Sequence, residues 1–179
     1  MVKYLRYFII KNIKHIKYIV LIMLLALAII AVLRFFDNPS PEKQIAMRLE
    51  KFLTYASKSS GDKLSTGLIK SKSLEKFFMP NCRFYIRVSS FSGTYSPEQI
   101  SSNSMRCRTI FKYVKFSAHD VQITLNSPTT ATVDFTGALN GLTKRGKAID
   151  DYRELTCKLQ LTEGAWLISS VSVREIIKK

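Results

Sequence analysis

The sequence predicts an α+β protein in which one N-terminal transmembrane helix precedes a domain of helices packed on a curved antiparallel sheet. Three observations lead to this prediction. Residues 18–33 contain no charged residue, no proline and no glycine. Apolar residues then recur at helical spacing in segments between residues 41 and 114. From Lys115 onward they alternate with polar residues, as they do in strands that bury one face.

Residues 18–36 (YIVLIMLLALAIIAVLRFF) form the predicted membrane-spanning helix. At about 1.5 Å per residue they span roughly 28 Å, close to the hydrocarbon thickness of a bilayer. Residues 1–17 contain basic side chains and no acidic one, which predicts a cytoplasmic leader. We therefore expect a single-pass protein of the inner (cytoplasmic) membrane. Its anchor contacts the lipid bilayer, and its C-terminal domain is periplasmic or extracellular.

A cleaved signal peptide is the alternative interpretation of this N-terminus. Ala26-Leu27-Ala28 has the small-x-small pattern of a cleavage site. Cleavage there would leave the apolar residues 29–33 at the new N-terminus, whereas mature proteins usually start with polar residues. This favours an anchor that is retained.

The net charge is strongly positive, with 28 Lys and Arg against 13 Asp and Glu in 179 residues. Six of the basic residues and none of the acidic ones precede Asp37, which leaves 22 against 13, a net charge of about +9. These basic residues form no run longer than two, and no nucleic-acid-binding motif accompanies them. The pattern therefore indicates a basic surface, suited to an anionic membrane or wall polymer, rather than a nucleic-acid site.

Residues 37–41 form a short stalk, and residues 42–179 are enough for one domain with its own core. Ser40 and Pro41 are typical of an N-cap and a first helical residue. Shorter helical segments follow over residues 63–70 and 73–78, and a strand over 82–89. The first helix should end near residues 59–61. Its apolar residues recur at helical spacing: Ile45, Leu49, Phe52, Leu53 and Ala56.

The second half of the domain begins with a helix and continues as strands. Residues 93–95 break the preceding strand, and Ser96 with Gln99 forms a predicted capping box for a helix whose apolar stripe runs to Val114. Alternation then predicts four strands joined by short links, with turns at residues 126–129, 140–147 and 163–164. The last strand covers residues 166–177. These four strands form an antiparallel meander.

This order of elements resembles the nuclear transport factor 2-like superfamily, also called SnoaL-like, over residues 41–177. The closing segments Glu163-Gly164-Ala165-Trp166-Leu167-Ile168 and Val171-Ser172-Val173 are similar to the end of that fold. The resemblance implies a cone-shaped domain whose bent sheet wraps a long helix and leaves a cavity at the wide end. Members use this cavity as an enzyme pocket, as a binding pocket, or not at all. The layout is also similar to that of the VirB8-type scaffold subunit of bacterial type IV secretion systems.

Enzymes of this superfamily place an acidic or histidine general base in the cavity. His119 shares strand parity with Val121, so we expect it to face the cavity. Asp151 and Arg153 share parity with Leu155 and are expected near the same mouth. Together they are the candidate pocket residues, although no motif assigns a catalytic role to any of them. The alternative is an ion pair between Asp151 and Arg153 at the rim.

Three cysteines, Cys82, Cys107 and Cys157, lie after the predicted anchor. In an oxidising compartment two of them could form a disulfide, whereas their apolar neighbours indicate buried free thiols. Neither they nor the two histidines have the spacing of a metal site, so we expect no metal and no other cofactor.

The first functional hypothesis is a non-catalytic, membrane-anchored binding or assembly module outside the cytoplasm. It would bind a protein partner, or a second copy of itself, through the sheet face. The alternatives are a membrane-tethered SnoaL-like enzyme (isomerase, cyclase or hydrolase), a type IV secretion-like scaffold subunit, and a sensor that binds a small apolar ligand in its cavity.

Overall fold

The computed structural model describes residues 22–29, 39–86 and 92–175. The chain divides into two units, Met1–Ser40 and Pro41–Lys179. In the first unit the structure describes a helix over residues 22–29 with exposed side chains. None of the helices in the described ranges is long and apolar enough to span a membrane. The leader (1–17), most of the anchor (18–36) and the start of the stalk (37–41) lie outside the described residues, so all three stay predictions.

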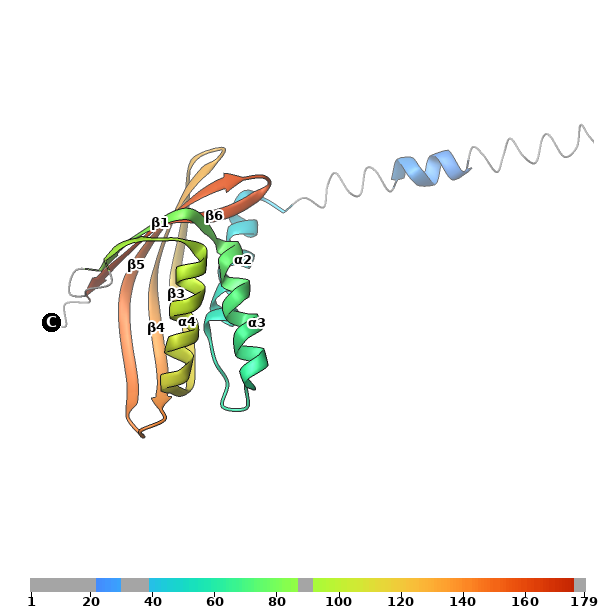
Figure 1. Ribbon diagram of the computed structural model, residues 1–179. Helices are drawn as coiled ribbons and strands as arrows, with labels where there is room; N and C mark the ends of the chain where they lie inside the picture. The colour runs from blue at the N-terminus through green and yellow to red at the C-terminus, as the bar shows by residue number, and fades with distance from the viewer. Residues whose placement is uncertain (1–21, 30–38, 87–91, 176–179) are drawn as a thin grey trace, which may run out of the picture. The chain divides into compact units, whose positions relative to one another are not determined.

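Helices and one six-stranded sheet make up the described part of the second unit (Figure 1). The helices α2, α3 and α4 all lie on one side of a curved sheet in this view. The elements, in chain order, are α2 (Pro41–Ala56), α3 (Leu64–Leu74), the 3-10 helix η1 (Glu75–Phe77), β1 (Phe78–Ile86), β2 (Gly93–Tyr95), α4 (Pro97–Ile110), β3 (Phe111–Ser127), β4 (Thr130–Thr143), β5 (Ala148–Thr162) and β6 (Ala165–Glu175).

The helix starts agree with the sequence predictions. α2 begins at Pro41, and α4 begins after a complete capping box. Ser96 Oγ accepts a hydrogen bond from the Gln99 backbone N–H at 3.3 Å, and Gln99 Oε1 accepts one from the Ser96 N–H at 2.9 Å. The predicted end of α4 is wrong, because the helix stops at Ile110 and Val114 already pairs with Gly141 in the sheet. Aromatic and β-branched residues after Ile110 favour the strand conformation.

The sheet has the strand order β2-β1-β6-β5-β4-β3. The predicted antiparallel meander of β3 to β6 is confirmed. The prediction of a wholly antiparallel sheet is wrong, since β1 pairs with β6 in parallel. Residues 93–95 were expected only to break a strand, yet they form β2, which pairs antiparallel with β1. Short links in the sequence predict which consecutive strands pair with each other. They do not predict that β1, which is distant in the sequence, pairs with the last described strand, β6.

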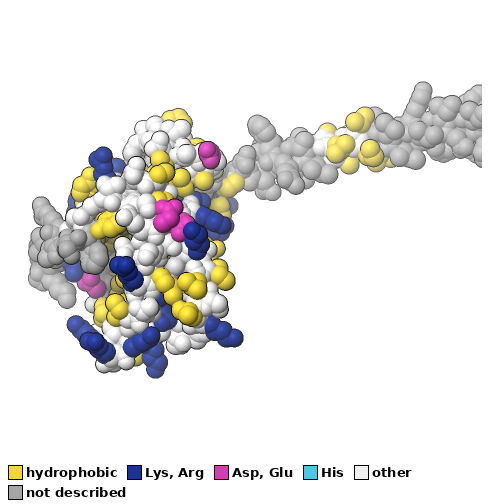
Figure 2. Space-filling view, viewed as in Figure 1, with side chains coloured by type: hydrophobic (Ala, Val, Ile, Leu, Met, Phe, Trp, Pro, Cys, Tyr) yellow, Lys and Arg dark blue, Asp and Glu magenta, His cyan; other side chains and the backbone are white. Residues whose placement is uncertain are grey.

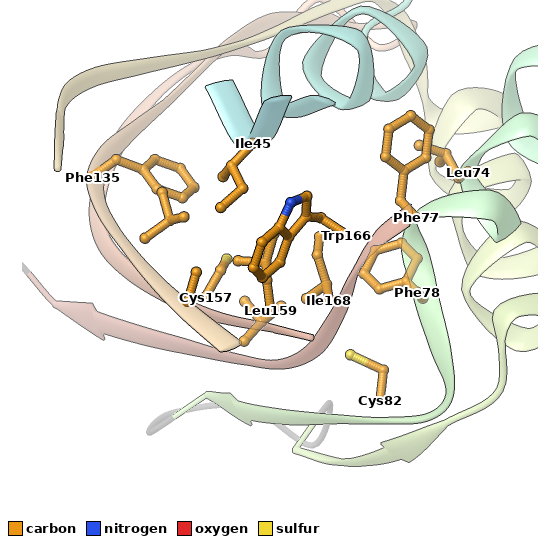
Figure 3. Packing of buried hydrophobic residues seen from close by; sticks show 13 residues of the cluster. Ile45, Leu74, Phe77, Phe78, Cys82, Phe135, Cys157, Leu159, Trp166 and Ile168 are labelled. Carbon is orange, nitrogen blue, oxygen red and sulfur yellow. The ribbon is translucent and has the colours of Figure 1, made fainter. Parts of the chain in front are cut away.

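The hydrophobic core lies between the helices and the sheet face that they cover. Figure 3 shows Ile45 of α2 pointing toward Trp166 and Ile168 of β6. Ile45 is 1% exposed and Trp166 is 3% exposed. Phe52 of α2 contacts Phe77 edge-to-face, with ring centroids 5.8 Å apart. The amphipathic stripe predicted for α2 is thus the face that closes the core.

Candidate functional site

A cavity of about 560 Å³ lies between the helices and the inner face of the sheet. Its size is within the usual range of small-molecule pockets. Trp166 and Ile168 belong both to the core and to the cavity wall. The wall is almost wholly apolar, with side chains from α2 and from β4, β5 and β6 that include Leu49, Phe52, Leu139, Leu155, Trp166 and Val173.

Asp151 and Arg153 both line this cavity, as their strand parity predicts. Arg153 Nε donates a hydrogen bond to Asp151 Oδ2 at 3.0 Å. Their side chains are 48% and 38% exposed, so the pair lies where the cavity meets solvent. Among the lining residues that the structure describes, Asp151 carries the sole carboxylate. It is therefore the group of this wall that could accept a proton from a bound molecule.

His119 does not join them. Its partner across the β3–β4 pair is Thr136, whose neighbour on β5 is Glu154, and these residues share the face of the sheet away from the cavity. The prediction that His119 faces the cavity is wrong because the register shifts between His119 and Gln122. Asp120 has a φ of 54° within this bulge. One extra residue there reverses the parity, so residues before and after the bulge point to opposite faces.

Arg108, on the last turn of α4, is a cavity residue that sequence reasoning did not find. It is only 4% exposed, and burial lowers the pKa of its guanidinium. Nη2 donates to the carbonyl oxygens at the end of α2, with a distance of 3.1 Å to Ser57 O and a shorter bond to Tyr55 O. Arg108 thus holds the C-terminus of α2 against α4. No sequence signal separates such an arginine from a solvated one.

Arg48, on α2, is a second arginine of the cavity wall. Its Nη2 donates to the Lys76 carbonyl oxygen, and its Cζ lies 4.9 Å from the centre of the Phe77 ring. Burial lowers the pKa of this guanidinium as well. The cavity therefore has positive groups set into a hydrophobic wall.

The cysteines are free thiols. Cys82 and Cys157 are buried, and burial raises the pKa of each to about 12. Cys107 is exposed and lines the cavity from α4, in the apolar stripe that the sequence predicts for this helix. The sequence left two alternatives open, a disulfide and buried free thiols. Cys82 and Cys157 are buried free thiols, whereas Cys107 is a free thiol that is exposed.

No group of three or more His, Cys, Asp or Glu side chains able to hold a metal ion occurs within residues 22–29, 39–86 and 92–175. On the face of the second unit seen in Figure 2, Lys and Arg side chains are scattered among polar and hydrophobic ones. A binding site of the described residues is accordingly best sought in the cavity.

Comparison with known proteins adds the fold. No protein-family model matches the sequence, and no curated protein does either. Among solved structures, a scytalone dehydratase-like protein from Novosphingobium aromaticivorans has a TM-score of 0.63 at 12% identity, covering 76% of this chain and 84% of its own. A calcium/calmodulin-dependent protein kinase II association-domain-like protein from Xanthomonas campestris has a TM-score of 0.59 at 19% identity, and the match covers 80% of this chain and 93% of its own. A hexachlorocyclohexane dehydrochlorinase (LinA) has a TM-score of 0.60 at 12% identity, and the match covers 78% of this chain and 87% of its own.

These identities show a shared fold and not a shared activity. Residues 41–175 therefore have the cone-shaped α+β fold of the nuclear transport factor 2-like, or SnoaL-like, proteins.

Proposed function

We propose that the cone cavity binds an apolar small molecule. The observation that supports this most is the cavity itself, about 560 Å³ with an almost wholly apolar wall. Burial of apolar ligand surface would drive binding at roughly 25 cal/mol per Å² before the costs of association. This proposal replaces assembly through the sheet face as the leading hypothesis, because the described sheet offers no comparably defined site.

We further propose that the chain is a SnoaL-like enzyme in which Asp151 accepts a proton from the bound molecule. Two of the structural neighbours are a dehydratase-like protein and a dehydrochlorinase, which remove water or hydrogen chloride from their substrates. Elimination, isomerisation and cyclisation can each begin when a base removes a proton from the substrate. Arg153 Nε, 3.0 Å from Asp151 Oδ2, would hold this carboxylate in position at the mouth. A carrier or sensor is the second candidate, because its function needs only the apolar wall.

Binding can be measured with the protein's own fluorophore. Trp166 is the single tryptophan of the sequence and lines the cavity. We expect apolar ring compounds to change its emission in the full chain, held in nanodiscs so that no free detergent competes. Val173→Phe, which fills part of the cavity, should weaken binding at least tenfold. Val121→Phe is the matched control, since Val121 is 40% exposed and is not a lining residue. Equal binding by both variants would contradict the proposal.

Proton abstraction needs a separate test. In heavy water, an apolar ketone such as 2-tetralone takes up deuterium next to its carbonyl group when a base removes that proton. We expect the full chain to accelerate this uptake and Asp151→Asn to abolish the acceleration, as followed by mass spectrometry. If binding occurs but Asp151→Asn exchanges deuterium as fast as the unchanged chain, the carrier or sensor function is favoured.

We propose, as the sequence predicts, that residues 18–36 anchor the chain in the inner membrane and present the cavity outside the cytoplasm. Added protease should then digest a C-terminally tagged chain in spheroplasts. Protection of the tag would reverse this topology. The scaffold hypothesis predicts, in addition, crosslinked partners or dimers in intact membranes, and a chain captured only as a monomer would remove its support.

A further inference from the structure

The lining of the cavity has an unbalanced charge. Its described charged side chains are Arg48, Arg108, Arg153 and a single carboxylate, that of Asp151. Because Asp151 forms an ion pair with Arg153, those two charges offset each other. The charges of Arg48 and Arg108 remain, in a wall that is otherwise almost wholly apolar. A charge in such surroundings is costly unless an opposite charge compensates it.

Arg108 shows where that compensation is incomplete. Its Nε and Nη1 atoms are buried and have no hydrogen-bond partner among the described residues. Asp62 is the acid nearest to them, but its Oδ2 lies 3.9 Å from Nη1, beyond hydrogen-bond length. The same Oδ2 accepts a hydrogen bond from Lys70 Nζ at 2.8 Å. Lys58, which donates to the Arg108 carbonyl oxygen, adds a further positive charge.

Leaving a buried charged donor unpaired costs more free energy than leaving a neutral one unpaired. Native proteins pair the large majority of their buried side-chain polar atoms, so an exception needs a physical explanation. Arg48 shows the same feature less strongly, since its Nε is also buried without a partner while the side chain itself is only partly buried. Both arginines hold structural bonds through Nη2 and keep their Nε donors unused.

We infer that the cavity takes an amphipathic acid, an apolar molecule whose carboxylate pairs with Arg108. This inference rests on the proposed apolar binding and names the class of ligand. Charge-assisted hydrogen bonds from a guanidinium to a carboxylate are about twice as strong as neutral ones. Ser104 and Cys107 of α4 line the cavity beside Arg108 and offer polar contacts at the same end. The apolar wall, including Trp166, holds the rest of the molecule.

The test compares an acid with its alcohol in the unchanged full chain. 12-Bromododecanoate and 12-bromododecanol differ in the charged end, and bromine quenches tryptophan on contact, so quenching of Trp166 reports entry into the cavity. We expect the acid to bind at least tenfold more tightly than the alcohol at pH 7.5. Equal affinities would overturn the assignment of the ligand class. If neither compound quenches Trp166, the proposed apolar binding fails as well, so the two failures are distinguishable.

Variants then locate the carboxylate. Arg108→Gln should abolish the preference for the acid over the alcohol. Arg106→Gln is the matched control, because Arg106 is exposed on the same helix and does not line the cavity. Arg48→Gln and Arg153→Gln should keep a clear preference for the acid. A preference lost in Arg153→Gln and kept in Arg108→Gln would overturn the role of Arg108. If Arg108→Gln does not fold, the acid–alcohol comparison in the other variants still decides the ligand class.

Discussion

Asp151 accepts a hydrogen bond from Arg153 across 3.0 Å, and both side chains are more than a third exposed. An ion pair in such a position contributes about 0–1 kcal/mol to stability, because solvent screens it. We therefore expect Asp151→Asn and Arg153→Gln each to change the free energy of unfolding by less than about 1 kcal/mol. Urea denaturation of both variants measures this. A larger loss would assign the pair to the fold rather than to the ligand.

His119→Ala should leave ligand binding unchanged within about twofold. The side chain is exposed on the sheet face away from the cavity, where its Nε2 lies 3.3 Å from Ser117 Oγ. Quenching of Trp166 by the bromoacid checks this expectation, with Val173→Phe as the variant that does lose binding. A tenfold effect of His119→Ala would show that the bulge does not keep this residue out of the cavity.

The cysteines should differ in reactivity. Cys107 is exposed, whereas Cys82 and Cys157 are buried with pKa values raised to about 12. Since the thiolate is the reactive form, a maleimide at pH 7.5 should modify one thiol per native chain and three in urea. Mass spectrometry identifies the modified residue. A bound cavity ligand should slow the modification of Cys107, which lines the cavity, and modification of Cys157 at a similar rate would contradict the buried position.

Stability should decrease at alkaline pH. Burial holds the pKa of Cys82 and Cys157 at about 12 in the folded chain, above the value of about 8.5 expected for an unfolded thiol. The unfolded chain therefore releases these protons first, so the stabilisation is complete below pH 8.5 and is lost progressively up to pH 12. Urea denaturation between pH 7 and pH 10.5, with a reductant present, measures the slope.

The matched control for this pH effect is the double variant Cys82→Ala/Cys157→Ala. Lysines and tyrosines titrate in the same range in both proteins, so the difference between the two slopes isolates the thiols. We expect a shallower decrease in the double variant. Equal slopes would show that the buried thiols do not contribute to the pH dependence.

Ser96→Ala should destabilise the domain by about 1 kcal/mol, the usual cost of a lost N-cap. The hydroxyl is the acceptor for the Gln99 N–H, and its loss leaves that donor to water. Ser102→Ala, at an exposed position inside the same helix, serves as the control and should change stability by less than about 0.5 kcal/mol. Equal effects of the two substitutions would contradict the capping role.

Local signals in the sequence predict local structure well here. Ser96 and Gln99 define the start of α4, and Pro41 defines that of α2, because capping depends on residues only three positions apart. Parity likewise places Asp151 and Arg153 on the cavity wall, since β5 pairs with β4 without a register shift. These features need no information from distant parts of the chain.

The features that the sequence does not predict depend on distant contacts. The bulge before Gln122 reverses the parity of His119, and no residue pattern marks its position. The parallel pairing of β1 with β6 joins segments about ninety residues apart, for example Phe84 with Val171. Arg108 of α4 is buried because its guanidinium donates to a carbonyl oxygen at the end of α2. This contact depends on how α2 and α4 pack together, which the sequence does not predict.

The strand order has a consequence for how the domain is made. β6 is the last strand of the sheet in the sequence, yet it lies in the middle, between β1 and β5. The ribosome synthesises the chain from its N-terminus. β1 and β2 therefore leave the ribosome long before β6, the strand that pairs with β1, has been made. Until residues 165–175 have been synthesised, Phe78 and Cys82 lack the strand β6, whose Ile168 and Val171 belong to the same core cluster. The sheet should therefore fold in one step, after β6 has been synthesised. A nascent chain that stops before Ala165 should be the form most sensitive to proteases and most prone to aggregation.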